Sequence, residues 1–266
     1  MRRLSSLMLG MLLGVSVSMD ASAGAADTPP DSPETIHVNA IRNPEVRKYS
    51  AIVAGLDAFE RGHRMAPAAD VLRFRVERRA WTDKTPKPGE APLALRLEGK
   101  DGFVLPLTLN DAVETIVPRS SAALAADSEL VLNRKRRMVR VTPLVRSPGL
   151  PDNVRRLGDL RLECQVMVAI GKEELGLMRT LFVNSVLLTP NWCSFFKAER
   201  DGFPFEAPER LARATLREGD RTKDLPVEGR SFRTAMNDPD WSDEALIELA
   251  FEPVTGTAGE TPRTAP

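Results

Sequence analysis

The chain has 266 residues, and its 37 Lys and Arg residues are balanced by 37 Asp and Glu residues. This balance gives no support to an overall electrostatic attraction to nucleic acid or to a membrane surface, and we expect no nucleic-acid partner. Two cysteines without CxxC spacing and two histidines supply too few ligands for a usual zinc site, so no metal and no cofactor are expected.

The first 25 residues have the pattern of a secretory signal peptide. A positive head, Arg2 and Arg3, precedes the small and apolar residues 4–17, and small residues follow at 21–25. The alternative is a membrane anchor, but the apolar stretch is shorter than the roughly 20 residues that span a bilayer, and Asp20 ends it. We therefore predict a periplasmic or secreted protein without a transmembrane segment after signal removal.

A helix is predicted directly after the leader. Asn43 as the cap, Pro44 at the first helical position and Glu45 in the first turn are typical of a helix start. Apolar residues then recur at helical spacing until Gly62, which predicts an N-terminal amphipathic helix over residues 44–62.

Most of the remaining chain has the alternating pattern of β-strands. Strands are predicted at 71–76, 93–97, 103–109, 129–132, 138–145 and 160–170. A turn at 100–102 joins the second and third of these into a hairpin, and a tip at 133–137 joins the fourth and fifth. The last strand directs Cys164 inward. Residues 172–186 predict a helical start that turns extended, although 181–189 is equally compatible with a strand.

The two cysteines, Cys164 and Cys193, are expected to form a disulfide, because an exported protein folds in an oxidising compartment. Closing a loop of about 30 residues gives roughly 3 to 4 kcal/mol in the chain-entropy model. The alternative is a metal or redox site, which lacks further ligands here. Nearby aromatic residues either pack against the disulfide or line a ligand groove, and these are Trp192, Phe195, Phe196, Phe203 and Phe205.

Two parts of the chain contain three short blocks in the same order. The first part has Leu97-Glu98-Gly99, Leu109-Asn110-Asp111 and residues 127–132, and the second has Val227-Glu228-Gly229, Met236-Asn237-Asp238 and residues 243–249. This order predicts two copies of one β-module. The alternative is that Glu-Gly and Asn-Asp are ordinary turn residues that recur by chance.

Gly102-Phe103, and in weaker form Gly229 followed by Phe232, resemble the hairpins of transthyretin-like or carboxypeptidase-regulatory-like β-sandwich modules. The resemblance implies a Greek-key sandwich with a binding or structural role, and it brings no catalytic residues. The chain also resembles exported envelope proteins of Gram-negative bacteria.

The predicted fold class is mainly β: two related β-sandwich modules with an N-terminal amphipathic helix and a short helical connector. The predicted order is signal peptide 1–25, flexible leader 26–43, helix 44–62, β-module 66–170, connector 171–189, second β-module 190–253 and disordered tail 254–266.

A run of cations marks the predicted hairpin tip. Arg134, Lys135, Arg136 and Arg137 lie in a stretch with nine basic residues between positions 134 and 161. At a tip they are suited to an anionic glycan, a lipid head group or an acidic envelope protein. The alternative is a solvated turn that discourages pairing of sheet edges.

Catalytic chemistry has little support in the residues. The candidate imidazole bases, His37 and His63, lie outside the predicted modules, and no nucleophile or phosphate-loop motif occurs. The sequence favours an exported non-enzymatic binding or assembly factor of the cell envelope. The alternative is an envelope-maintenance hydrolase that uses two carboxylates, which a pocket with two inward carboxylates would favour.

Overall fold

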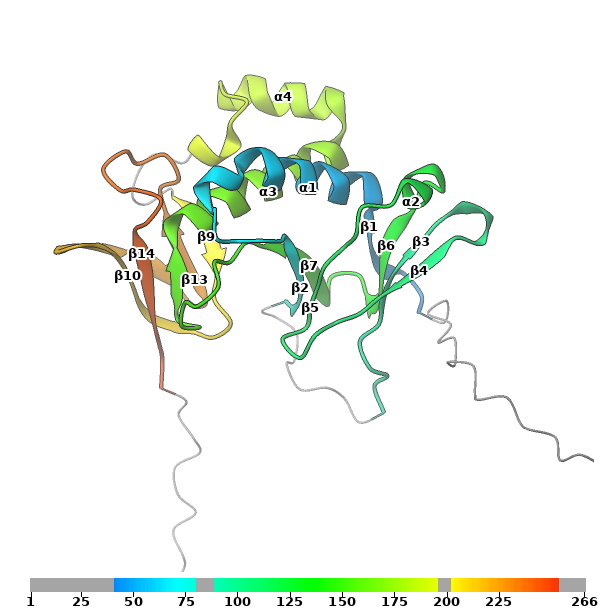
Figure 1. Ribbon diagram of the computed structural model, residues 1–266, viewed down its shortest axis with the longest axis horizontal. Helices are drawn as coiled ribbons and strands as arrows, with labels where there is room; N and C mark the ends of the chain where they lie inside the picture. Colours follow the sequence, from blue (N-terminus) through cyan, green and yellow to red (C-terminus); the bar gives the residue numbers. More distant parts are fainter. Residues whose placement is uncertain (1–40, 80–88, 196–201, 254–266) are drawn as a thin grey trace, which may run out of the picture. The chain divides into compact units, whose positions relative to one another are not determined.

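The computed structural model describes residues 41–79, 89–195 and 202–253, which belong to one compact unit. In these ranges fourteen strands form four antiparallel sheets, and strands outweigh helices, so the fold is mainly β as predicted (Figure 1). None of the helices in the same ranges has the length and apolar character that crossing a bilayer requires.

The earlier part of the chain forms two of the four sheets. Their strand orders are β1-β6-β3-β4 and β5-β2-β7. The elements are β1 (Pro44–Lys48), α1 (Tyr49–Gly62), η2 (His63–Met65), β2 (Arg73–Arg78), β3 (Leu95–Glu98), η3 (Lys100–Gly102), β4 (Val104–Leu107), β5 (Glu114–Thr115), α2 (Ser121–Ala125), β6 (Glu129–Lys135) and β7 (Val139–Leu144). The predicted strand that became β2 and the predicted β3–β4 hairpin are confirmed, the hairpin pairing Leu97 with Leu105.

The predicted start of the N-terminal helix was wrong. Residues 44–48 form β1, which pairs with β6, and α1 begins only at Tyr49. Asn43 has a φ of 62°, a left-handed conformation that asparagine tolerates better than most residues, so it directs the chain into a strand. The apolar face of α1, including Tyr49, Ile52 and Phe59, is buried as the helical spacing predicts.

The predicted hairpin of residues 129–132 and 138–145 was also wrong. Both strands exist, as β6 and β7, but they belong to different sheets. β1 and β3 occupy the two edges of β6, so no row of backbone groups is left there for β7, which pairs with β2 instead. At the predicted tip, an isolated bridge pairs Arg136 with Val139.

The later part of the chain forms the other two sheets, in the orders β11-β10-β14-β8 and β12-β13-β9. The elements are β8 (Val154–Arg156), α3 (Leu157–Leu175), α4 (Leu177–Leu187), η4 (Trp192–Ser194), β9 (Phe203–Glu206), β10 (Leu211–Glu218), β11 (Arg221–Leu225), β12 (Val227–Glu228), β13 (Ser231–Thr234) and β14 (Leu246–Phe251). A second buried cluster, with Phe232 and Ile247, fills the space between these sheets and α3.

The stretch 160–170, predicted as a strand, is part of helix α3. Leu157, Leu160 and Cys164 are buried in the later cluster, whereas Leu162, Val166 and Ile170 are buried in the earlier one. Successive residues of a helix are about 100° apart, so positions two apart face opposite sides. A helix buried on both sides therefore produces the same alternation as a half-buried strand.

The predicted connector is also helical at its centre. Residues predicted to turn extended form α4, which follows α3 after Gly176 and contacts it. Gly176 has a φ of 76°, which suits glycine and lets the chain reverse direction between the two helices. The sulfur atoms of Cys164 and Cys193 lie 2.11 Å apart, so the expected disulfide is formed between α3 and η4.

The matched blocks of the predicted repeat lie in sheets of different composition. β3 and β4 join β6 in a four-stranded sheet, whereas β12 and β13 join β9 in a three-stranded sheet. Each part of the chain nevertheless combines one four-stranded with one three-stranded sheet. The duplication stays a prediction.

Candidate functional site

The fold divides the predicted basic tip. Arg134 is buried, with its Nε 2.8 Å from a carboxylate oxygen of Glu90, and it donates hydrogen bonds of 2.6 and 2.7 Å to two backbone carbonyl oxygens. Lys135, Arg136 and Arg137 are exposed. The structure therefore leaves three of the four predicted cations at the surface, and their anion-binding role stays a prediction.

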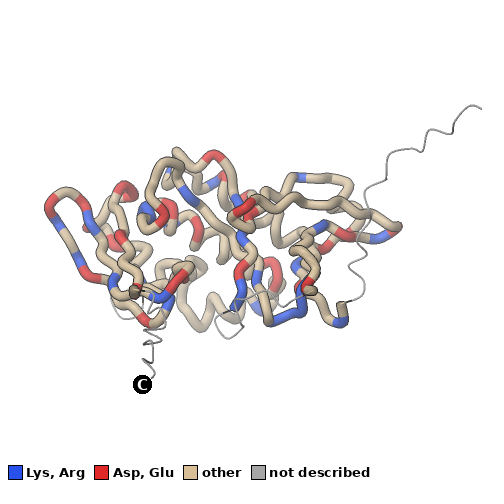
Figure 2. The backbone as a smooth tube through the Cα atoms, turned by 90° about the horizontal axis from the view of Figure 1, so that it is seen from below, with Lys and Arg blue, Asp and Glu red and all other residues tan. Residues whose placement is uncertain are grey.

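Several other arginines of the same basic stretch are directed at acidic partners. Arg140 lies between Glu77 of β2 and Glu206 of β9, to which it donates hydrogen bonds of 2.9 Å each. Burial opposes the charge of Arg140, but the two carboxylates outweigh it and raise its pKa. Figure 2 shows cationic and anionic residues interspersed along the described chain, as such pairing requires.

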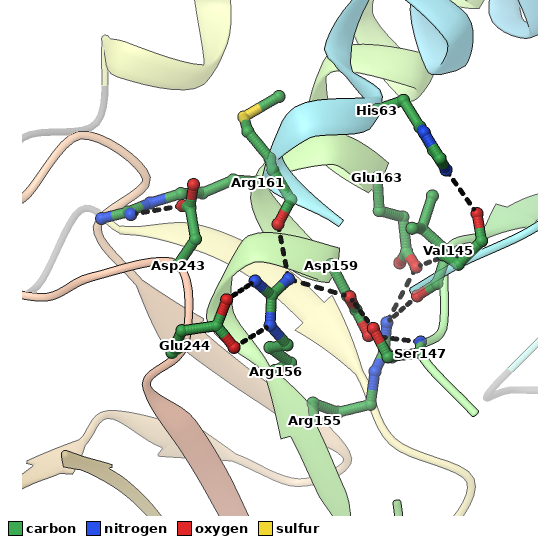
Figure 3. A network of polar contacts seen from close by, with 12 residues as sticks. His63, Val145, Ser147, Arg155, Arg156, Asp159, Arg161, Glu163, Asp243 and Glu244 are labelled. Carbon is green, nitrogen blue, oxygen red and sulfur yellow. Dashed lines mark hydrogen bonds and ion pairs between the residues drawn. The ribbon is translucent and has the colours of Figure 1, made fainter. Parts of the chain in front are cut away.

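The start of α3 carries a buried polar network (Figure 3). The Asp159 carboxylate, with 0 % of its surface exposed, accepts hydrogen bonds from the backbone N–H and the hydroxyl of Ser147 at 2.6 and 2.8 Å. The guanidinium of Arg156 lies 3.5 Å away. Asp159 thus has compensating partners for its charge, without which a buried carboxylate is strongly destabilising.

Glu163 lies one turn further along α3 and is also buried. It accepts hydrogen bonds from the backbone N–H of Val145 and from Arg155, both at 2.9 Å. Burial raises the pKa of Glu163, although the charge of Arg155 acts in the opposite direction. The contacts attach α3 to the end of β7.

Arg156 and Arg161 connect the start of α3 to the segment 236–244 (Figure 3). Arg156 binds both carboxylate oxygens of Glu244, and this hydrogen bonding lowers the pKa of Glu244. Arg161 donates to the carboxylate of Asp243 at 2.7 Å and to three carbonyl oxygens of the segment at 2.8 to 2.9 Å. This geometry fixes a loop to a helix and leaves these donors occupied.

Of the two candidate imidazole bases, the structure describes His63. His63 caps the end of α1, and its Nε2 lies 2.9 Å from the carbonyl oxygen of Ala69, while His37 lies outside the described residues. In the part of the chain that the structure describes, no three His, Cys, Asp or Glu residues are grouped to hold a metal ion. The network is best explained as a link between elements.

A cavity of about 190 Å³ lies beside this network. Its charged lining residues are Arg75, Glu77, Arg140, Arg155, Glu163 and Glu206. Each of the three carboxylates is paired with an arginine of the lining. The volume is below the roughly 300 Å³ at which ligand pockets usually begin, so the site has carboxylates but little room for a substrate.

A different kind of surface lies on α4, which has no buried residue. Six large apolar side chains project from this helix and its end, and we call them the α4 face. They are Leu177, Met178, Leu181, Phe182, Val186 and Leu188, exposed by 73, 79, 51, 70, 63 and 91 %. Figure 1 shows α4 lying along the outer side of α1 and α3. An apolar group of this size on a protein surface marks an interaction site more often than a solvated one.

An open groove lies next to the end of α4. Its volume is about 460 Å³, and its charged lining residues are Arg61, Arg64 and Lys172, without an acidic residue. Burial lowers the pKa of Lys172, whose ammonium group lies 5.2 Å from the centre of the Trp192 ring. Cys193 is part of the wall. We call this feature the basic groove.

The aromatic residues around Cys193 have separate positions. Phe205 is buried with Cys193 in the later cluster and stacks on Phe232 at 5.8 Å between ring centres. Trp192 is half-buried and donates a hydrogen bond of 2.8 Å to the side chain of Asn184 on α4. Phe196 lies outside the described residues. Phe203 lies 5.3 Å from Phe205 between ring centres and packs against the same cluster, so these two side chains agree with packing near the disulfide.

Comparison of the chain with models of protein families, with curated proteins and with solved structures finds no match. The resemblance to transthyretin-like modules is thus neither supported nor contradicted by relatives.

The sequence indicates the helical spacing of the apolar residues within 175–186 but not the exposure of their side chains. The spacing of a helix is visible in one chain, whereas the absence of a covering element becomes visible only in three dimensions. The arginine partners left no sequence signal, because Arg161 and Asp243 are 82 positions apart.

Proposed function

We propose that this protein is a non-enzymatic binding or assembly factor of the cell envelope and that it contacts its partner through the α4 face. The observation that carries the proposal is the exposure of Leu177, Met178 and Phe182, each by 70 % or more. A helix that is apolar on most sides is normally covered by protein or lipid. α4 contacts α3 but has no buried residue of its own, so the α4 face is left for a partner.

Export to an oxidising compartment is the second part of the proposal. The Cys164–Cys193 disulfide supports it, since structural disulfides are rare in reducing compartments. The signal-peptide pattern of residues 1–25 supports the same location, periplasmic or secreted. We further propose that the two sheet pairs are related β-sandwich modules, an arrangement compatible with one buried cluster for each pair.

A carboxylate hydrolase is the second candidate, because Glu163 has a raised pKa and lines a cavity with Glu77 and Glu206. A raised pKa suits a general acid. However, the carboxylate of Glu163 is held by Arg155 and by the backbone of Val145, and the cavity is small. The contacts give Glu163 a sufficient structural role, so binding is the better supported function.

The proposal is tested by sedimentation of the purified mature protein with washed envelope fragments. We expect the wild type to sediment with the fragments and Met178→Glu/Phe182→Glu to lose at least about tenfold in affinity, because a buried charge opposes the loss of apolar contact. Both side chains are exposed, so the fold should be kept, which circular dichroism checks.

Val104→Glu is the matched control, because Val104 is an apolar side chain exposed by 50 % on the edge strand β4. It should sediment as the wild type does. Equal sedimentation of a folded Met178→Glu/Phe182→Glu protein and the wild type would remove the α4 face as the contact.

A further inference from the structure

The α4 face ends close to the rim of the basic groove. The α4 face ends at Leu188, and Pro190 and Asn191, two residues further on, form a rim of the groove. Lys172 donates a hydrogen bond to the carbonyl oxygen of Pro190, which fixes this rim to α3. A partner that covers the end of α4 and extends past Pro190 therefore reaches the groove.

The charges along this surface favour an anionic partner. Arg61 and Arg64 are exposed cations of the groove, and no ion pair engages them in the described part of the chain. Arg179 adds an exposed cation on α4. Of the nearby acids, Glu60 is 3.0 Å from Arg119 and Glu174 is 3.4 Å from Arg47, while Glu173 is an exposed residue of α3. Cations thus exceed acids around the apolar side chains.

The apolar side chains project outward from one helix instead of lining a hollow. Such a ridge suits a soft, flat partner that closes around each side chain, as the boundary between head groups and acyl chains does. Phe and Leu at this boundary, a Trp at its edge and cations beside it are typical of helices that lie in a membrane surface. The half-buried Trp192, bonded to Asn184, has this edge position.

We propose that the α4 face and the basic groove dock together on the surface of an anionic phospholipid bilayer. This inference rests on the proposed function and names the partner of the same surface. Phe182 and its apolar neighbours enter the head-group boundary, while Arg61, Arg64 and Lys172 contact lipid phosphates. Since opposite charges are screened by salt, docking weakens as ionic strength rises.

The test is flotation of the purified mature protein with vesicles of defined lipids. One set contains phosphatidylglycerol and phosphatidylcholine, and the other contains phosphatidylcholine only. We expect binding to the anionic vesicles and weaker binding at high salt. Binding to the zwitterionic vesicles should be at least about tenfold weaker, since each cation near an anionic surface raises the affinity about fivefold.

Two variants separate the apolar from the electrostatic contribution. Phe182→Glu should weaken binding to anionic vesicles roughly 10- to 100-fold, because burial of one large apolar side chain contributes about that factor to the affinity. Arg61→Ala/Arg64→Ala should weaken it about 25-fold and remove most of the preference for anionic lipid. The matched control is Arg213→Ala/Arg217→Ala, which removes two exposed cations of β10 and should leave binding unchanged. A further variant, Arg136→Ala/Arg137→Ala, tests the predicted basic tip as the alternative contact.

Equal binding to both vesicle types, or full binding by Phe182→Glu, overturns the inference. If the protein does not bind vesicles but still sediments with envelope fragments through the α4 face, the lipid bilayer is not the partner and the proposed binding function stands. If light scattering finds a wild-type dimer that Phe182→Glu converts to a monomer, a second copy is the occupant, and the lipid proposal fails. Loss of binding in the tip variant only would assign the contact to residues 135–137.

Discussion

Helices α3 and α4 follow each other in the chain and touch, yet one is buried on two sides and the other has no buried residue. Both are rich in apolar side chains. The difference lies in what covers them, because α3 separates two hydrophobic clusters and α4 lies outside both. Apolar content predicts that a helix needs a partner, but it does not identify the partner as the protein's own core.

The polar residues of α3 extend this contrast. Asp159, Arg161 and Glu163 are engaged with loops and strands through hydrogen bonds of 2.6 to 2.9 Å. The polar side chains of α4 have local partners: Thr180 bonds to Lys172 and Ser185 to Leu181. α3 is therefore held in its position by many elements, and α4 mainly by its two ends.

The largest effect is expected from shortening a leucine. Leu162→Ala on α3 should lower the free energy of unfolding by about 2 to 5 kcal/mol, because it leaves a cavity in the earlier cluster. Leu181→Ala on α4, where the side chain is 51 % exposed, should stay within about 0.5 kcal/mol. Urea unfolding of both variants measures the difference, and similar losses for the two would contradict the contrast between the helices.

The second-largest difference in stability is expected between substitutions at two glycines of α3. A Cβ at Gly158 would lie 2.1 Å from the backbone oxygen of Met65, whereas one at Gly171 meets nothing within 4 Å. Gly158→Ala should cost about 1 to 3 kcal/mol through overpacking. Gly171→Ala should instead stabilise by about 0.5 to 1 kcal/mol, since alanine is the better helix former. Thermal unfolding distinguishes the two, and a loss at Gly171 equal to that at Gly158 would show that α3 is crowded along its whole length.

The smallest effect concerns Glu163 and pH. Burial raises the pKa of Glu163 in the folded state, so binding of a proton stabilises the folded protein relative to the unfolded chain. This stabilisation is fully present below about pH 4.5, the ordinary pKa of a glutamate, and it is lost as pH rises through the folded pKa. Glu163→Gln should remove this dependence of the unfolding free energy on pH, whose slope is at most about 1.4 kcal/mol per pH unit. Glu173→Gln, at an exposed position, should keep it. Stability measured from pH 4 upward provides the comparison, and an unchanged slope in Glu163→Gln would assign it to another group.

Prediction from the sequence was most successful where short-range patterns are sufficient. The strand that contains Phe74, the hairpin around Asp101 and the buried side of α1 all depend on neighbours within a few residues. Prediction failed at β1 and for the β6–β7 pairing, where a distant strand determined the outcome. Of the predicted tip, Arg134 is buried because Glu90 and two carbonyl oxygens engage it, which no local pattern indicates.

The amino-acid sequence by itself determined where apolar residues repeat, where turns occur and which two cysteines are able to pair. The tertiary structure decided that the alternation at 160–170 is a helix between two cores, that most arginines of the basic stretch face acids, and that the α4 face stays open. The physical reason is that burial depends on which elements meet in space. Two apolar stripes on opposite sides of a helix and one face of a strand look the same until both neighbours are in place.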